Sequence, residues 1–121
     1  MTVVLAVDAQ RPDASTIARA AACLRMGGLV AFPTETVYGL GVHALDRPAV
    51  LRLFAAKGRP ANDPLIVHVS SLAEVPPLVV ALPSHAAILA ERFWPGPLTL
   101  IMRRKPSVPS EVSAGLDTLA I

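Results

Sequence analysis

The sequence predicts an α/β fold, in which a β-sheet is packed against helices. Short β-prone segments alternate with amphipathic helical segments along the 121 residues, which is the pattern of a sheet covered by helices. Apolar residues make up 53% of the chain and charged residues 17%, a composition that excludes a disordered chain. The 12 prolines are spread along the sequence, so they mark the ends of elements and do not form one linker.

The N-terminal part predicts a strand, a helix and a second strand. Residues 3–7 (VVLAV) form a β-prone run. Ser15 can cap a helix that extends to about Met26, where two glycines stop it. The apolar face of that helix has the spacing i, i+4, i+7 and consists of Ile17, Ala21 and Leu24. Residues 29–32 are a compact apolar run, typical of a buried strand.

The remaining elements follow the same alternation. Asp46 can cap a helix through about Ala56, and Ser84 can cap another that ends near Phe93. Their expected inward faces are Val50, Leu51 and Phe54 in the first, and Ile88, Leu89 and Phe93 in the second. Strands are expected at residues 65–69, 98–102 and 117–121, and residues 94–97 (WPGP) form a rigid turn.

Composition and motifs exclude several classes of protein. The net charge is only +2, so charge alone demands no nucleic-acid partner. No apolar run approaches the roughly 18 residues of a membrane span, and the N-terminus does not have the features of a signal peptide. One cysteine excludes a disulfide framework, and the three histidines do not have metal-ligand spacing. We therefore expect one cytoplasmic domain over residues 1–121, without a metal site held by the protein.

A hydroxyl-bearing loop follows the predicted strand at residues 29–32. Residues 33–41 (PTETVYGLG) combine two threonines, a carboxylate, a phenol and two glycines. In open α/β sheets such loops often hold ligands, and these groups suit a small polar substrate or a phosphate. The alternative is a capped turn, in which Thr34 or Thr36 serves as the N-cap and Glu35 is exposed.

A cationic loop follows the second predicted helix. Lys57 and Arg59 flank a glycine, and together they can grip neighbouring phosphates. The alternative is that both merely complement the negative end of the helix. His68 lies in the β-prone run that comes next, where alternation places it on the face opposite to Val67. It can therefore face a cleft while Val67 faces the core. The alternative is that His68 is a core or edge residue with its hydrogen bonds satisfied.

These loops together resemble a known family. Residues 33–41 (PTETVYGLG), 56–69 (AKGRPANDPLIVHV), 93–100 (FWPGPLTL) and 114–121 (AGLDTLAI) look like the threonylcarbamoyl-AMP synthase family, the YrdC-like domain. The match extends in one register from about Gly27 to Ile121. The resemblance implies a twisted, mixed sheet flanked by helices around a concave basic cleft.

The resemblance also implies a reaction. The family is a nucleotidyltransferase that converts ATP, L-threonine and bicarbonate to threonylcarbamoyl-AMP and pyrophosphate, with Mg²⁺ accompanying the ATP. A tRNA threonylcarbamoyl-transfer machinery then modifies adenosine 37 of tRNA. Two alternatives remain open. One is a module that binds double-stranded RNA or tRNA, to which Arg103, Arg104 and Lys105 would contribute. The other is a carbamoyl-transfer domain of the hydrogenase-maturation type.

Residue roles follow from the same resemblance. The expected L-threonine contacts are Thr34, Thr36 and His68. The expected catalytic residues are Lys57 and Arg59, which also bind ATP together with Asp63 and Thr118. Asn62 is the alternative to Asp63 at this position. The family continues beyond the position of Ile121 with an arginine and a Ser-Ala-Asn motif. We therefore expect an N-terminal portion of the domain that carries part of the site and is weak or inactive by itself.

Overall fold

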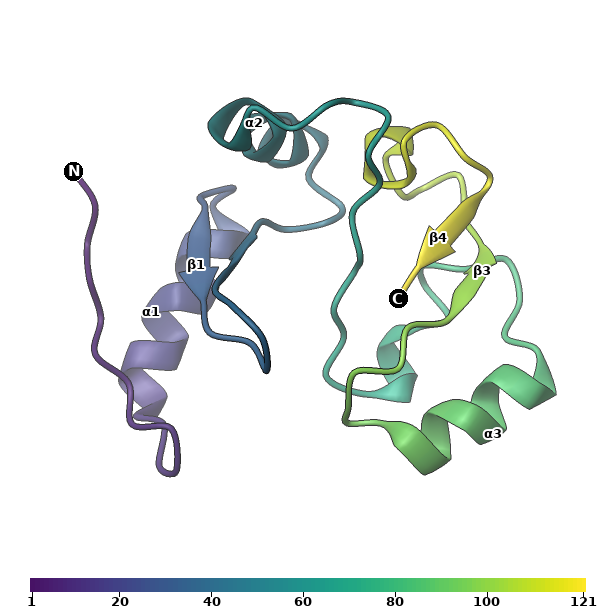
Figure 1. Cartoon of the computed structure of the whole chain (residues 1–121), viewed down its shortest axis with the longest axis horizontal. Coiled ribbons are helices and arrows are strands. Elements are labelled where there is room, and N and C mark those ends of the chain that lie inside the picture. Colours follow the sequence, from purple (N-terminus) through teal and green to yellow (C-terminus); the bar gives the residue numbers. More distant parts are fainter. The chain divides into compact units, whose positions relative to one another are not determined.

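The computed structural model describes all residues 1–121, and it shows helices and short strands in alternation (Figure 1). The α/β class predicted from the sequence is confirmed. Two compact units are present, Met1–His43 and Ala44–Ile121. None of the helices is long and apolar enough to cross a membrane. The concave basic cleft and the single domain stay predictions.

The helix of the first unit, α1 (Ala14–Arg25), begins one residue before the expected cap. Its N-cap is Asp13 and not Ser15, because the Asp13 carboxylate accepts a hydrogen bond from the backbone N–H of Thr16 at 2.8 Å. A carboxylate at this position also opposes the positive end of the helix dipole. Gly27, at φ 78°, follows the C-cap Met26, so the predicted glycine stop is confirmed.

The strand expected at residues 3–7 does not form. The segment is extended without a strand partner, and Val3, Val4 and Val7 are 62%, 89% and 45% exposed. A β-prone sequence becomes a strand only when a neighbouring strand takes its backbone hydrogen bonds. The prediction of a strand at residues 3–7 is therefore wrong.

A hairpin completes the first unit. Strand β1 (Val30–Phe32) pairs antiparallel with β2 (Gly39–Gly41), and Phe32 lies opposite Gly39. The sequence predicted β1 and treated the residues of β2 as loop. A Cβ atom at Gly41 would lie 2.7 Å from the Phe32 ring, and one at Gly39 would lie 3.3 Å from it. The two glycines therefore make room for an aromatic ring.

The second unit begins with α2 (Arg47–Lys57). Asp46 caps it as predicted, since its carboxylate accepts from the Ala49 N–H at 3.1 Å. Gly58 ends it in the left-handed conformation, φ 58° and ψ 28°. The buried face is shifted from the expected one: Leu53 is 3% exposed, whereas Leu51 is 44% exposed. The helix packs on the 3-10 helix η2 (Ser110–Ser113), and this contact selects the buried side.

Strand pairing in the second unit is mixed. Strand β3 (Ile101–Arg103) pairs antiparallel with β4 (Thr118–Ala120), and Ile66 forms a parallel bridge to Ala120 on the other side of β4. The strand expected at residues 65–69 is thus reduced to one bridge. Val67, Met102 and Leu119 point to the buried face and are at most 8% exposed.

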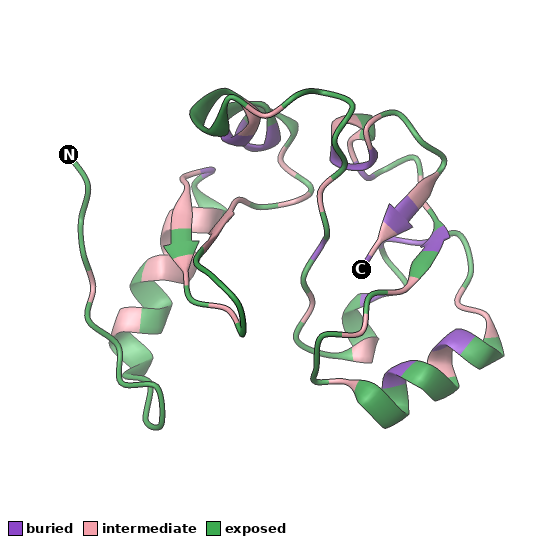
Figure 2. Cartoon of the chain, viewed as in Figure 1, coloured by how far each residue is buried: buried purple, intermediate pink, exposed green.

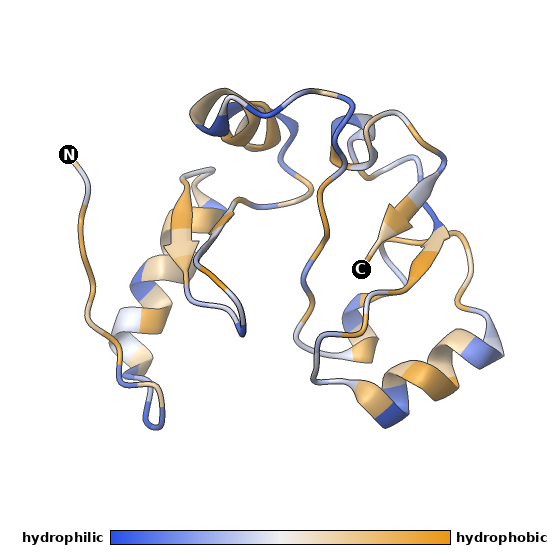
Figure 3. Ribbon diagram, in the orientation of Figure 1, coloured by the Kyte–Doolittle hydropathy of each residue, from blue (hydrophilic) through white to orange (hydrophobic).

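Helix α3 (Ser84–Phe93) turns a different face inward from the one predicted. Ile88, Leu89 and Phe93 are 63%, 38% and 52% exposed, while Ala86 and Ala90 are buried. Figures 2 and 3 show apolar residues along the exposed surface of this helix. Small alanine side chains allow α3 to lie close to the 3-10 helix η1 (Leu72–Glu74). Ser84 is the first helical residue, and the N-cap is Pro83, which offers no side-chain cap.

The rigid turn after α3 is confirmed. The Trp94 indole N–H donates to the carbonyl oxygen of Leu98 at 2.7 Å, and the Trp94–Pro95 peptide bond is cis. A Cβ at Gly96 would lie 2.5 Å from the Phe93 carbonyl oxygen. Only glycine therefore fits at this point of the turn.

Candidate functional site

The threonine-rich loop between β1 and β2, residues 33–38, is held by one side chain. The Thr34 hydroxyl oxygen accepts hydrogen bonds from the backbone N–H groups of Thr36 and Val37, both at 3.2 Å, and donates to the Val37 carbonyl. Threonine hydroxyls commonly organise turns in this way. Thr34 therefore has a structural role in this loop, in addition to the predicted role of a threonine contact.

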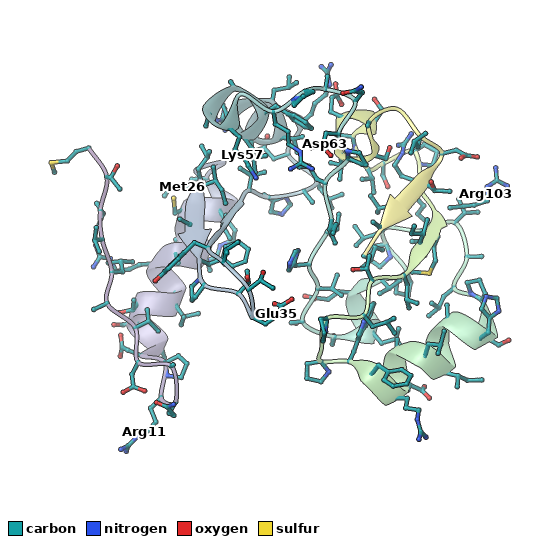
Figure 4. The ribbon with its side chains drawn as sticks, viewed as in Figure 1. Arg11, Met26, Glu35, Lys57, Asp63 and Arg103 are labelled. Atoms are coloured by element: carbon teal, nitrogen blue, oxygen red, sulfur yellow. The ribbon has the colours of Figure 1, made fainter.

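Thr36 is the threonine that the loop exposes. Its hydroxyl oxygen lies 3.3 Å from that of Thr34, so the turn fixes its position. Figure 4 shows Glu35 at the tip of the same loop, and Val37 and Tyr38 are 74% and 76% exposed. The loop thus offers a hydroxyl, a carboxylate and a phenol at its surface, held by a preorganised backbone.

The cationic loop, residues 57–64, contains two cations in different situations. Lys57 lies in the last turn of α2, is exposed, and makes no hydrogen bond or ion pair. The Arg59 side chain is only 23% exposed. Its Nε donates to the Asp63 carbonyl oxygen at 3.1 Å, and its Nη2 donates to the Pro64 carbonyl oxygen at 2.7 Å. Nη2 also lies 2.9 Å from Asp63 Oδ1, so Arg59 closes the loop on itself.

The start of α2 is anchored to the rest of the second unit by an ion pair. Arg47 Nη2 lies 2.6 Å from Glu111 Oε1, and Arg47 Nε donates to the same oxygen. The hydrogen bond from Arg47 lowers the pKa of the Glu111 carboxyl, and the same bond raises the pKa of Arg47. The pair therefore joins the first residue of α2 to the 3-10 helix η2.

The other end of the cationic loop leads into the strand bridge. The Leu65 N–H donates to the carbonyl oxygen of Val112 at 2.8 Å, and the Val67 N–H donates to the carbonyl oxygen of Ala120 at 2.9 Å. His68 is exposed and its Nδ1 lies 3.1 Å from the Ile66 carbonyl oxygen, whereas Val67 is 8% exposed. The alternation predicted for Val67 and His68 is confirmed.

The predicted site residues fall into both units. Thr34 and Thr36 belong to Met1–His43, and the other five belong to Ala44–Ile121: Lys57, Arg59, Asp63, His68 and Thr118. Within the second unit, the parallel bridge brings the segment that follows the cationic loop beside β4, where half-buried Thr118 lies opposite Arg103. The assignment of these residues to ATP and L-threonine stays a prediction.

Two of the three basic residues at the end of β3 and directly after it bind backbone carbonyls. Arg104 Nε donates to the Leu116 carbonyl at 3.3 Å, and its Nη1 donates to Val108. Lys105 Nζ donates to the carbonyl oxygen of Pro76 at 2.8 Å. Arg103 alone is largely exposed, at 75%, and Figure 4 shows it well away from Lys57. Neighbouring arginines look equivalent in the sequence, which does not reveal that Arg104 binds backbone carbonyls.

Comparison with known proteins identifies the family. The family model for Sua5, YciO and YrdC proteins, described as telomere recombination, matches residues 22–121. The chain therefore belongs to this family, as the four motifs predict.

Individual relatives agree with this assignment. A threonylcarbamoyl-AMP synthase of Pyrococcus abyssi is 50% identical over 121 residues, 100% of this chain and 35% of that protein. One of Bacillus subtilis is 52% identical over 106 residues, 87% of this chain and 31% of that protein. The crystal structure of P. abyssi Sua5 complexed with L-threonine gives a TM-score of 0.87 at 53% identity, over 91% of this chain and 32% of that one. The chain thus spans about a third of the length of these relatives.

Proposed function

We propose that this chain contributes part of the active site of a threonylcarbamoyl-AMP synthase. The observation that supports this best is the 50% identity to such a synthase over every residue of the chain. The proposed enzyme is a nucleotidyltransferase that uses ATP, L-threonine and bicarbonate. Its product would supply a tRNA threonylcarbamoyl-transfer machinery.

The proposed reaction proceeds in two steps. The amine of L-threonine adds to carbon dioxide derived from bicarbonate and gives a carbamate, with release of water. A carbamate oxygen then attacks the α-phosphorus of ATP, the bond from that phosphorus to the bridging oxygen breaks, and pyrophosphate leaves. This route needs no covalent bond to the protein, so the residues act by positioning the substrates and by stabilising charge.

Each predicted residue has a place in this scheme. Exposed Thr36 and His68 would hold L-threonine, and Thr34 would support Thr36 through the turn. Lys57 and Arg59 would neutralise the triphosphate, which enters as its Mg²⁺ complex. The ammonium group of Lys57 has no partner in the chain, and its backbone lies in the last turn of α2, which suits this role.

The nucleotide side of the proposed site includes two more residues. Asp63 and Thr118 would lie next to the ATP, on the cationic loop and at the start of β4. The RNA-binding alternative receives less support, because two of the three neighbouring cations on which it depends donate to backbone carbonyls. The N–H groups that make these bonds would have to leave the carbonyls before they could bind a phosphate.

A chimeric enzyme tests the proposal in a complete protein. This chain replaces the matching 121 residues of the P. abyssi relative, and the product is measured by incorporation of radiolabelled bicarbonate that depends on ATP and L-threonine. We expect synthase activity in the chimera and a loss of roughly 10²–10³-fold in Arg59→Ala, since one preorganised charged donor is removed. Arg92→Ala on exposed α3 is the matched control and should retain activity. A folded chimera without activity would contradict the proposal.

A further inference from the structure

The cationic loop carries its own anion. Asp63 Oδ1 lies 2.9 Å from Arg59 Nη2, so one of the two cations expected to bind phosphate already has a carboxylate partner. Lys57 has none. The loop therefore presents one compensated cation and one free cation to a ligand.

The geometry points to Asp63 as an internal competitor of the polyphosphate at Arg59. This inference rests on the proposed function and deepens it. The Asp63 carboxylate forms an ion pair with Arg59 Nη2, so a phosphate that binds Arg59 competes with it for the same positive charge. Asp63 thereby lowers the affinity of the loop for ATP and for pyrophosphate.

The N–H groups of Arg59 divide into those that the chain uses and those that a phosphate could use. Nε and one N–H of Nη2 hold the backbone carbonyls of Asp63 and Pro64. Nη1 makes no hydrogen bond to the chain. A phosphate that binds arginine through two parallel hydrogen bonds needs two neighbouring donors. The Nη1–Nη2 edge supplies them, and a phosphate that binds this edge meets the ion-paired Asp63 carboxylate beside Nη2.

The exposure of the pair makes this exchange feasible. The Asp63 side chain is 53% exposed, so water hydrates the carboxylate once it is released. Exposed pairs of this kind change equilibria by only about twofold to fivefold. The competition therefore lowers the affinity without blocking the site. The two backbone carbonyls are neutral, so they keep the loop closed without opposing the anion.

The test measures binding of ATP and of inorganic pyrophosphate to the chimeric enzyme by calorimetry, with and without Mg²⁺. In Asp63→Asn the side chain keeps an acceptor oxygen and loses its charge. We expect this variant to bind both ligands about twofold to fivefold more tightly, with or without the metal ion. Glu91→Gln on α3 removes the same charge from an exposed helix and should leave both affinities unchanged.

A double-mutant cycle with Arg59→Ala locates the effect. If Asp63 competes at Arg59, the gain from Asp63→Asn disappears in the Arg59→Ala background. If Asp63→Asn still increases the affinity in the Arg59→Ala background, the inference is overturned, because the Asp63 carboxylate then repels the anionic ligand without acting through Arg59. Unchanged or weaker binding by Asp63→Asn would also overturn it, and weakening confined to Mg²⁺ would assign Asp63 to the metal of the nucleotide. An active chimera combined with any of these results rejects the competition and leaves the proposed function intact.

Discussion

Replacing Thr34 by valine removes one oxygen atom on which the backbone of the hydroxyl loop depends. That oxygen accepts from the N–H groups of Thr36 and Val37 and donates to the Val37 carbonyl. A hydrogen bond of this kind contributes about 1 kcal/mol net, which corresponds to about a fivefold change in an equilibrium constant. We therefore expect the amide hydrogens of Thr36 and Val37 to exchange with solvent about fivefold faster in Thr34→Val.

Hydrogen exchange followed by NMR measures these two amides directly. Thr34→Ser keeps the oxygen and should keep the slow exchange. Thr36→Val is the matched control, because the Thr36 hydroxyl accepts from neither amide. Equal exchange rates in Thr34→Val and the unmodified chain would refute the structural role of the Thr34 hydroxyl.

Three further predictions concern stability, each measured by urea unfolding. Leu119→Ala, at a side chain only 1% exposed, should cost about 2–5 kcal/mol; a smaller loss would contradict its burial. Arg104→Met leaves backbone carbonyls without a donor and should lower the free energy of unfolding by about 1–3 kcal/mol. Exposed Arg103→Met should change it by no more than about 0.5 kcal/mol. Equal losses in the two variants would contradict the inference that Arg104 binds the backbone and Arg103 does not. Arg47 lowers the folded pKa of Glu111 from 4.5, so the pair stabilises the fold above the unfolded pKa and this contribution is lost as the pH falls through the folded value. Arg47→Met should therefore reduce the loss of stability on acidification, and an unchanged acid profile would contradict this.

Local signals made the sequence informative about α2. Asp46 and Gly58 act on the backbone within one turn of their own positions. The sequence therefore predicts both ends of α2 without information about the element that packs against the helix. The N-terminus of α1 was misjudged by two residues for a related reason. Asp13 and Ser15 are both suitable caps, and Ser15 itself donates to the Asp13 carboxylate at 2.6 Å.

Long-range packing made other predictions fail. The buried side of α3 is chosen by close approach to η1, which favours Ala86 and Ala90 over the larger Ile88. Residues 3–7 have β propensity but no partner strand in the chain. Both outcomes depend on neighbours that are distant in sequence.

In the candidate site, too, the sequence shows local features and not long-range contacts. Motifs identify Lys57 and Arg59, because both stand beside a helix end that has a simple local signature. The sequence does not identify the residues that these side chains contact. The sequence cannot show that Arg59 binds Asp63, or that Arg104 and Arg103 differ in their surroundings.

The packing of Phe32 on Gly39 and Gly41 ties the two ends of the PTET segment together. Phe32 stands just before residues 33–38 and Gly39 just after them, and the two face each other across the hairpin. An insertion or deletion between them would shift the Phe32 ring away from the two glycines, even if both threonines were retained. The number of residues in this segment is therefore constrained as strictly as their chemistry, and spacing is itself a property that a working variant must preserve.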